Sequence, residues 1–201
     1  GQVLEEPAGQ VDLLPTICGL LGIESPKNVA LDGASLAPLL TDRRGEFERD
    51  QPLFWLLPTS GPVAAVRDGD YVLTCNRDYK FPRDYEAMAR IKKEIENLLR
   101  KKGSFEEEVR GSTLRKQMFE GFKDQQAEKL RGQFIRLNMF NESWIPTIRK
   151  GGYRQFQLFD LKRDPGQSKD VSERFPDIVR RLKEQFLEIN ASVMADAVDW
   201  R

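Results

Sequence analysis

Four segments of the chain have the apolar and aromatic composition that is typical of β-strands. The first is residues 52–57 (P-L-F-W-L-L), and the next two are residues 63–67 and 71–76. These two flank Asp68-Gly69, a dipeptide that commonly closes a tight hairpin between antiparallel strands. The fourth segment is residues 154–160. The pattern therefore predicts four strands, three of them consecutive.

From Pro176 onward, apolar residues recur at spacings of three or four, which predicts an amphipathic helix with one buried stripe. These residues are Ile178, Val179, Leu182, Phe186, Ile189 and Val193. The predicted fold class is therefore α+β, with a small four-stranded antiparallel sheet covered by a C-terminal amphipathic helix.

An insertion of about 75 residues, 77–149, separates the third and fourth predicted strands. It contains two apolar stripes at helical spacing. The stronger one is Tyr85, Met88, Ile91, Ile95, Leu98 and Leu99, interrupted at Gly103; the weaker one is Leu114, Met118, Phe122, Leu130 and Phe134. Residues 84–131 contain ten acidic and twelve basic residues. We interpret the insertion as a solvated helical hairpin, and a partner-binding arm is the alternative.

The N-terminal part predicts two short helices. Residues 12–21 form the first, with Asp12 as N-cap, Pro15 in the first turn and Gly22 just after the end. Apolar residues surround most of this helix, so we expect it to be buried on more than one side. They are Val11, Leu13, Leu14, Ile17, Leu20 and Leu21. A second short helix is predicted to begin after Ser35 as its N-cap.

Composition narrows the class of protein. The chain has 201 residues, enough for one ordinary domain, and its 32 basic and 32 acidic residues give a formal charge of zero. This balance argues against a nucleic-acid partner. No apolar run approaches the roughly 20 residues of a membrane span, and the first ten residues show no signal-peptide pattern. We expect Cys18 and Cys75 to be buried free thiols, with a disulfide as the alternative.

Six landmarks in order give the chain a resemblance to the C-terminal portion of a sulfatase, arylsulfatase-like and of the alkaline-phosphatase-like superfamily. They are D-L-L-P-T (12–16) with Gly22-Ile23, L-D-G-A-S-L-A-P-L-L (31–40), P-L-F-W (52–55), R-D-G-D (67–70), L-F-D-L-K-R-D-P (158–165) and the final amphipathic helix. The similarity covers residues 10–76 and 153–200. It implies that residues 1–48 are the tail of the catalytic α/β domain and that residues 49–201 are the smaller C-terminal subdomain.

The resemblance also implies a reaction for the parent enzyme, the hydrolysis of a sulfated carbohydrate or an aryl sulfate. In this family the nucleophile is a formylglycine made in a Cys/Ser-x-Pro-x-Arg motif, with histidines and a calcium site nearby. This chain contains neither that motif nor any histidine. We therefore assign it no catalytic or metal residue, expect it to be inactive alone, and expect a missing catalytic domain as its partner. A periplasmic or secreted location is implied by the family.

Three residues are candidates for the rim of the substrate cleft: Trp55, Arg67 and Arg77. The alternative for Trp55 is a core position, and the alternative for Arg67 is a hairpin surface position. Asp68 and Asp70 are interpreted as solvated hairpin carboxylates rather than metal ligands.

Two further functions remain open. The chain could be the tail of a phosphodiesterase or phosphonate hydrolase of the same superfamily, or a stand-alone interaction module that uses residues 77–149. If the chain is a fragment, the apolar residues of the first helix lose their cover. We therefore expect residues 1–40 to be loosely held or to dock on another surface.

Overall fold

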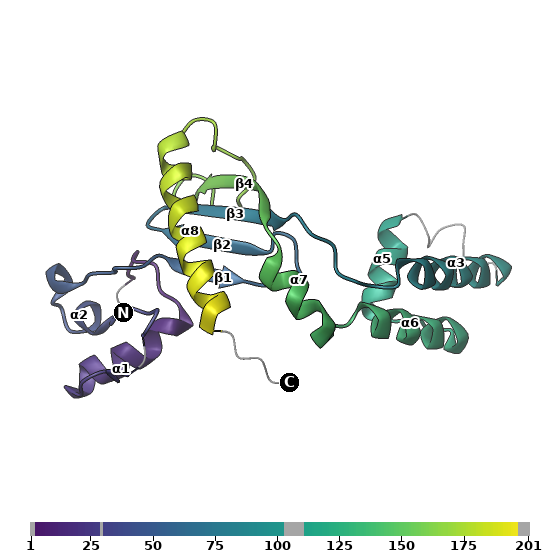
Figure 1. Ribbon diagram of the computed structural model, residues 1–201, viewed down its shortest axis with the longest axis horizontal. Helices are drawn as coiled ribbons and strands as arrows, with labels where there is room; N and C mark the ends of the chain where they lie inside the picture. Colours follow the sequence, from purple (N-terminus) through teal and green to yellow (C-terminus); the bar gives the residue numbers. More distant parts are fainter. Residues whose placement is uncertain (1–2, 29, 103–110, 197–201) are drawn as a thin grey trace. The chain divides into compact units, whose positions relative to one another are not determined.

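The computed structural model describes residues 3–28, 30–102 and 111–196, and the side chains of residues 111–113 are not described. The chain divides into two compact units. The sheet unit comprises residues 1–78 and 151–201, and the helical unit comprises residues 79–150. Figure 1 shows the elements of both units.

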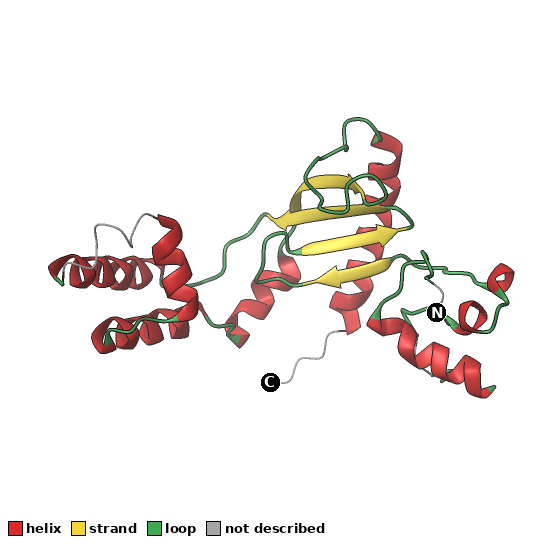
Figure 2. Ribbon diagram, turned by 180° about the vertical axis from the view of Figure 1, so that it is seen from behind, coloured by secondary structure: helices red, strands yellow, loops and turns green. Residues whose placement is uncertain are grey.

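The sheet unit is built on four antiparallel strands in the order β1-β2-β3-β4 (Figure 2). Their bounds are β1 Leu53–Leu56, β2 Ala64–Asp68, β3 Tyr71–Arg77 and β4 Tyr153–Asp160. All four predicted strands are confirmed to within one residue at each end.

The β2–β3 hairpin turns one residue later than the dipeptide that predicts it. Asp68 pairs with Tyr71, so the turn consists of Gly69 and Asp70. Gly69 has φ +56°, a left-handed conformation that glycine adopts with little steric cost.

Helix α8, Pro176–Asp196, covers one face of this sheet and contacts β2, β3 and β4 (Figure 1). Leu182 and Phe186 on α8 are fully buried. Both belong to the core cluster that Val66, Leu73 and other strand residues form. The predicted cover of the sheet by a C-terminal helix is therefore confirmed. Each large apolar side chain buried in this way contributes roughly 1.5–3 kcal/mol to stability.

Short elements precede the sheet: the 3-10 turn η1 Gln10–Asp12, helix α1 Leu13–Leu21, helix α2 Ala37–Leu40 and the 3-10 turn η2 Arg44–Glu46. Gly22 ends α1 with φ +66°, as predicted for the residue after a helix.

Asp12 occupies the predicted N-cap position of α1, but with helical φ and ψ and without a side-chain hydrogen bond to the first amides of α1. Its side chain instead accepts a hydrogen bond from Gly9 N at the start of η1. The predicted N-cap at Ser35 is wrong. The helix α2 begins at Ala37 with Leu36 in the N-cap position. Ser35, one residue earlier, accepts only a long hydrogen bond of 3.4 Å from the Ala37 N–H.

The predicted burial of α1 on more than one side is also wrong for the part of the chain that the structure describes. Only Pro15, Thr16 and Cys18 of α1 are buried. The large apolar residues on and beside the helix are between 45% and 66% exposed: Val11, Leu13, Leu14, Ile17, Leu20, Leu21 and Ile23. We call this set the α1 apolar face.

The helical unit contains α3 Tyr85–Lys101, α5 Gly111–Glu120, α6 Gln125–Asn138 and α7 Ile145–Lys150, the last preceded by the 3-10 turn η3 Glu142–Trp144. Residues from α3, α5 and α6 share a buried core, which confirms a helical insertion. They are Ile95, Leu99, Leu114, Ala127 and Leu130.

The weaker stripe does not form one continuous helix, so the two-helix hairpin is wrong. Gly121 ends α5 with φ +108°. Asp124 then caps α6 by accepting hydrogen bonds from the N–H groups of Gln126 and Ala127. The predicted interruption of the stronger stripe at Gly103 lies outside the described residues.

Candidate functional site

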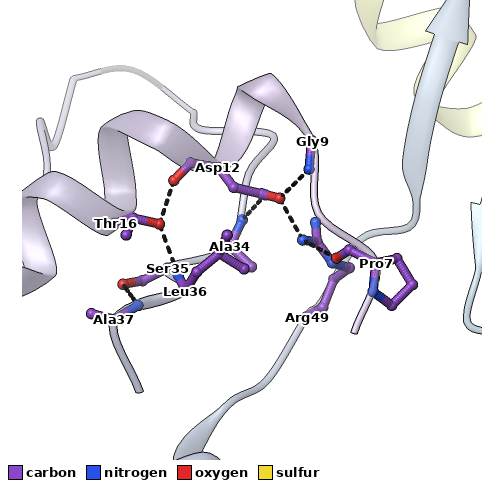
Figure 3. Close-up of polar contacts among 9 residues, drawn as sticks. All are labelled: Pro7, Gly9, Asp12, Thr16, Ala34, Ser35, Leu36, Ala37 and Arg49. Atoms are coloured by element: carbon purple, nitrogen blue, oxygen red, sulfur yellow. Dashed lines mark hydrogen bonds and ion pairs between the residues drawn. The ribbon is translucent and has the colours of Figure 1, made fainter. Parts of the chain in front are cut away.

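The aspartate of D-L-L-P-T is the centre of a buried polar junction (Figure 3). The side chain of Asp12 is fully buried, and its Oδ2 accepts hydrogen bonds from Gly9 N and Arg49 Nη2, both at 2.7 Å. Its Oδ1 accepts a hydrogen bond from Ala34 N at 2.9 Å. Asp12 therefore connects the start of α1 to the second motif, residues 31–40, and to Arg49, which precedes β1.

Thr16, the last residue of D-L-L-P-T, makes a second link between the two motifs. Its Oγ1 donates a hydrogen bond to the Asp12 carbonyl oxygen at 2.6 Å and accepts one from Leu36 N at 2.8 Å (Figure 3). Side chains of the first motif therefore hydrogen-bond to the backbone of the second motif at two points.

Glycines in both motif regions permit this close approach. A Cβ on Gly33 would lie 2.0 Å from the carbonyl oxygen of Val11, a backbone atom that cannot swing aside. A Cβ on Gly19 would lie 2.6 Å from Ser35 Oγ and 3.1 Å from the Cβ of Ala37. Gly33 of the second motif is thus explained by its close approach to the backbone of η1.

The junction holds a fixed charge pair. Burial raises the pKa of Asp12, but the hydrogen bonds from Arg49, Gly9 and Ala34 and the charge of Arg49 outweigh it, so the pKa lies below its ordinary value. Arg49 also donates from Nη2 to the Pro7 carbonyl oxygen at 3.1 Å. An aspartate held ionised in this way is suited to fastening the chain and not to proton transfer near neutral pH.

The residues present do not fit formylglycine or calcium. Cys18 and Cys75 are free and buried, as predicted, and neither stands in the sequence that the family converts to formylglycine. Burial raises the pKa of the Cys75 thiol to about 12. Across residues 3–28, 30–102 and 111–196, no group of three or more Cys, Asp or Glu side chains could hold a metal ion.

Two of the three predicted rim residues lie on the same face of the sheet. Trp55 on β1 is 48% exposed, so the alternative of a core position is wrong. Arg67 on β2 pairs with Leu53, two residues from Trp55, and its Nε donates to the carbonyl oxygen of Gly69 at 3.1 Å. Arg67 is therefore a hairpin residue whose guanidinium holds the turn.

Arg77 lies at the other end of β3. Arg67 pairs with Val72, five residues before Arg77, which corresponds to roughly 17 Å along a strand. The Nη1 of Arg77 donates to the carbonyl oxygens of Pro58 and Ser60, in the β1–β2 connection. The structure thus does not gather the three candidates into one cluster.

A cavity that the sequence did not indicate lies beside α8. Its volume is about 380 Å³. Its lining residues are Ala30, Leu31, Asp32, Asp50, Gln51, Pro52, Gln185, Glu188, Ile189, Ser192, Val193 and Asp196. No linear motif could have found it, because its walls come from segments more than a hundred residues apart.

The α1 apolar face is a second surface feature, and its exposure is the one expected of this helix if the chain is a fragment. Contiguous exposed apolar residues of this kind mark interaction surfaces in soluble proteins. No helix within the described ranges is both long enough and apolar enough to cross a membrane.

No protein-family model matches the chain, and no curated protein matches it. The resemblance to sulfatases therefore rests on the six sequence segments themselves.

Proposed function

We propose that this chain is the C-terminal portion of a sulfatase, a hydrolase of sulfated carbohydrates or aryl sulfates, and that the catalytic domain of the parent enzyme packs on the α1 apolar face. The chain supplies no nucleophile. Its part is to complete the hydrolase fold with the sheet unit and to present α1 to the domain that carries the reactive groups.

The observation that carries the proposal is the junction of Figure 3. The residues that make the two motifs sulfatase-like, Asp12 and Thr16 in one and Gly33 in the other, are the ones that hold the motifs together. The same joint leaves the apolar side of α1 facing outward. A covering domain would gain on the order of 10 kcal/mol by burying that side, at roughly 1.5–3 kcal/mol per large apolar residue.

The first test compares this chain with the protein encoded when the adjacent upstream sequence is included. We expect no turnover of a chromogenic aryl sulfate by this chain alone, and turnover by the longer protein. The upstream sequence is expected to contain Cys/Ser-x-Pro-x-Arg. Turnover by this chain alone, or an upstream sequence without that motif, would overturn the proposal.

The second test addresses the α1 apolar face in the longer protein. Leu13→Gln combined with Ile17→Gln is expected to lower the unfolding temperature and the sulfatase activity, because both side chains would be buried by the catalytic domain. In this chain alone the same pair should change the free energy of unfolding by less than about 1 kcal/mol, as for exposed sites. Leu187→Gln, at an exposed α8 position that is 46% accessible, is the matched control.

A further inference from the structure

The zero net charge of the chain conceals opposite charges on its two units. The helical unit, residues 79–150, contains 17 Lys and Arg against 11 Asp and Glu, a formal charge of +6. The sheet unit contains 15 against 21, a formal charge of −6. The helical unit is therefore a basic body that attracts anions, although the whole chain is neutral.

Part of this basic charge follows one face of α3. Residues 90, 93, 97 and 101 recur at spacings of three and four, so they share one side of the helix. Arg90, Lys93 and Lys101 on this side are exposed. Lys101 lies 11 residues after Arg90, which corresponds to about 16 Å along a helix. We call these three residues the α3 basic face.

The α3 basic face points away from the core of its own unit. Ile91, Ile95 and Leu99 on the opposite side of α3 face the core that α5 and α6 complete. Two exposed glutamates border the face, Glu86 and Glu94, each four residues from Arg90. Glu86 is 91% exposed and lies 3.9 Å from Arg90, a loose surface pair that contributes little. Cations held on a rigid helix in this way remain available to an external anion.

The residue types on this face favour a sulfated polysaccharide over a single-stranded nucleic acid as its ligand. Proteins that bind single-stranded nucleic acid combine cations with aromatic rings on which bases stack. The side of α3 that carries residues 86, 90, 93, 97, 100 and 101 contains no aromatic residue. Sulfate groups along a sugar chain require only spaced cations.

We infer that the α3 basic face binds a linear polysaccharide carrying sulfate esters and so recruits a polymeric substrate to the enzyme. The choice of a sulfated polymer rests on the proposed function. It narrows the substrate class from sulfate esters in general to sulfated polysaccharides.

The experiment measures binding of the full chain to dextran sulfate, with uncharged dextran and single-stranded poly(U) as comparison polymers. We expect binding to dextran sulfate that weakens with salt, and none to dextran. The triple variant Arg90→Gln, Lys93→Gln, Lys101→Gln should bind roughly 100-fold more weakly at 0.1 M salt. Three lost cation contacts should also reduce the slope of log affinity against log salt by about 2.

A matched variant, Lys27→Gln, Lys162→Gln, Lys169→Gln, removes the same charge from exposed positions of the sheet unit. It should bind as the unaltered chain does, and circular dichroism should show both variants folded. The inference is overturned by absent dextran sulfate binding, by equal losses in the two triple variants, or by tighter binding of poly(U). The assay needs no turnover, so its failure is distinct from that of the sulfatase proposal, which the upstream sequence decides.

Discussion

At the scale of single residues, the buried carboxylate of Asp12 organises the N-terminal part of the chain. It accepts hydrogen bonds from two backbone N–H groups and from the guanidinium of Arg49. An ion pair with 12% and 0% side-chain exposure is costly to break from one side, because the remaining charge stays buried. Asp12 is thus a stability residue, although its motif also occurs in an enzyme family.

Asp12→Asn keeps the shape of the side chain and removes its charge. At pH 7 we expect a loss of about 3 kcal/mol in the free energy of unfolding, measured by urea denaturation. The pKa of Asp12 is lower in the folded state than the ordinary value of 3.8. Its stabilisation is therefore complete above that value and declines as the pH falls through the folded pKa.

The difference between the unaltered chain and Asp12→Asn should accordingly be constant from pH 7 to 5. It should shrink as the pH falls below 3.8, because the unfolded chain then binds a proton at Asp12 more readily than the folded chain does. The control is Asp50→Asn, which changes an exposed carboxylate beside Arg49. It should have little effect on the free energy of unfolding at any pH in this range. A difference that grows toward pH 3 would contradict the assigned role.

The close approach of Gly33 to η1 gives a second prediction at this scale. Gly33→Ala places a methyl group 2.0 Å from the Val11 carbonyl oxygen, so the backbone must shift. We expect a loss of about 1–3 kcal/mol in urea denaturation, as for other overpacked sites. Gly45→Ala, where no atom lies within 4 Å of the added Cβ, should cost less than about 0.5 kcal/mol. Equal effects would show that the close approach is not required.

At the scale of elements, local composition and spacing were enough to predict the four strands and α8. The strands and α8 were predicted because apolar composition and helical spacing are local signals. The helical unit shows the limit of stripes alone. Gly121 and Asp124 are ordinary stop and start signals for helices, and reading them would have divided the second stripe into α5 and α6.

The candidate site was predicted less well, for a physical reason. Asp12 looks like an N-cap when only its neighbours are considered. Its actual partners Ala34 and Arg49 are 22 and 37 residues away in the sequence, and no local pattern specifies them. The outward orientation of the apolar side of α1 is likewise a tertiary property, since the pattern records apolarity without recording what covers it.

At the scale of the whole molecule, the helical unit is inserted between adjacent points of the sheet unit. Asp78 N donates to the Gly152 carbonyl oxygen at 3.1 Å, and Gly152 N donates to Asp78 Oδ1 at 2.8 Å. The chain therefore leaves β3 and returns to β4 across one pair of hydrogen bonds. The core cluster under α8 draws all its residues from outside the insertion.

Replacing residues 79–150 by Asn-Gly should consequently leave the sheet unit folded, because a three-residue loop ending at Gly151 can close β3 and β4 into a hairpin. We expect dispersed amide NMR signals and cooperative thermal unfolding. Leu182→Ala should cost about 2–5 kcal/mol in the shortened and the full-length chain alike, since the same buried residue is truncated in the same core.

The shortened chain also separates the two activities argued for this molecule. It retains the α1 apolar face and the junction at Asp12, so pairing with an upstream catalytic domain should persist. It loses the whole basic unit and keeps a formal charge of −6, so binding to dextran sulfate should disappear. A shortened chain that unfolds, or whose Leu182→Ala variant is no less stable, would mean that the helical unit is a structural part of the sheet unit and not an inserted binding arm.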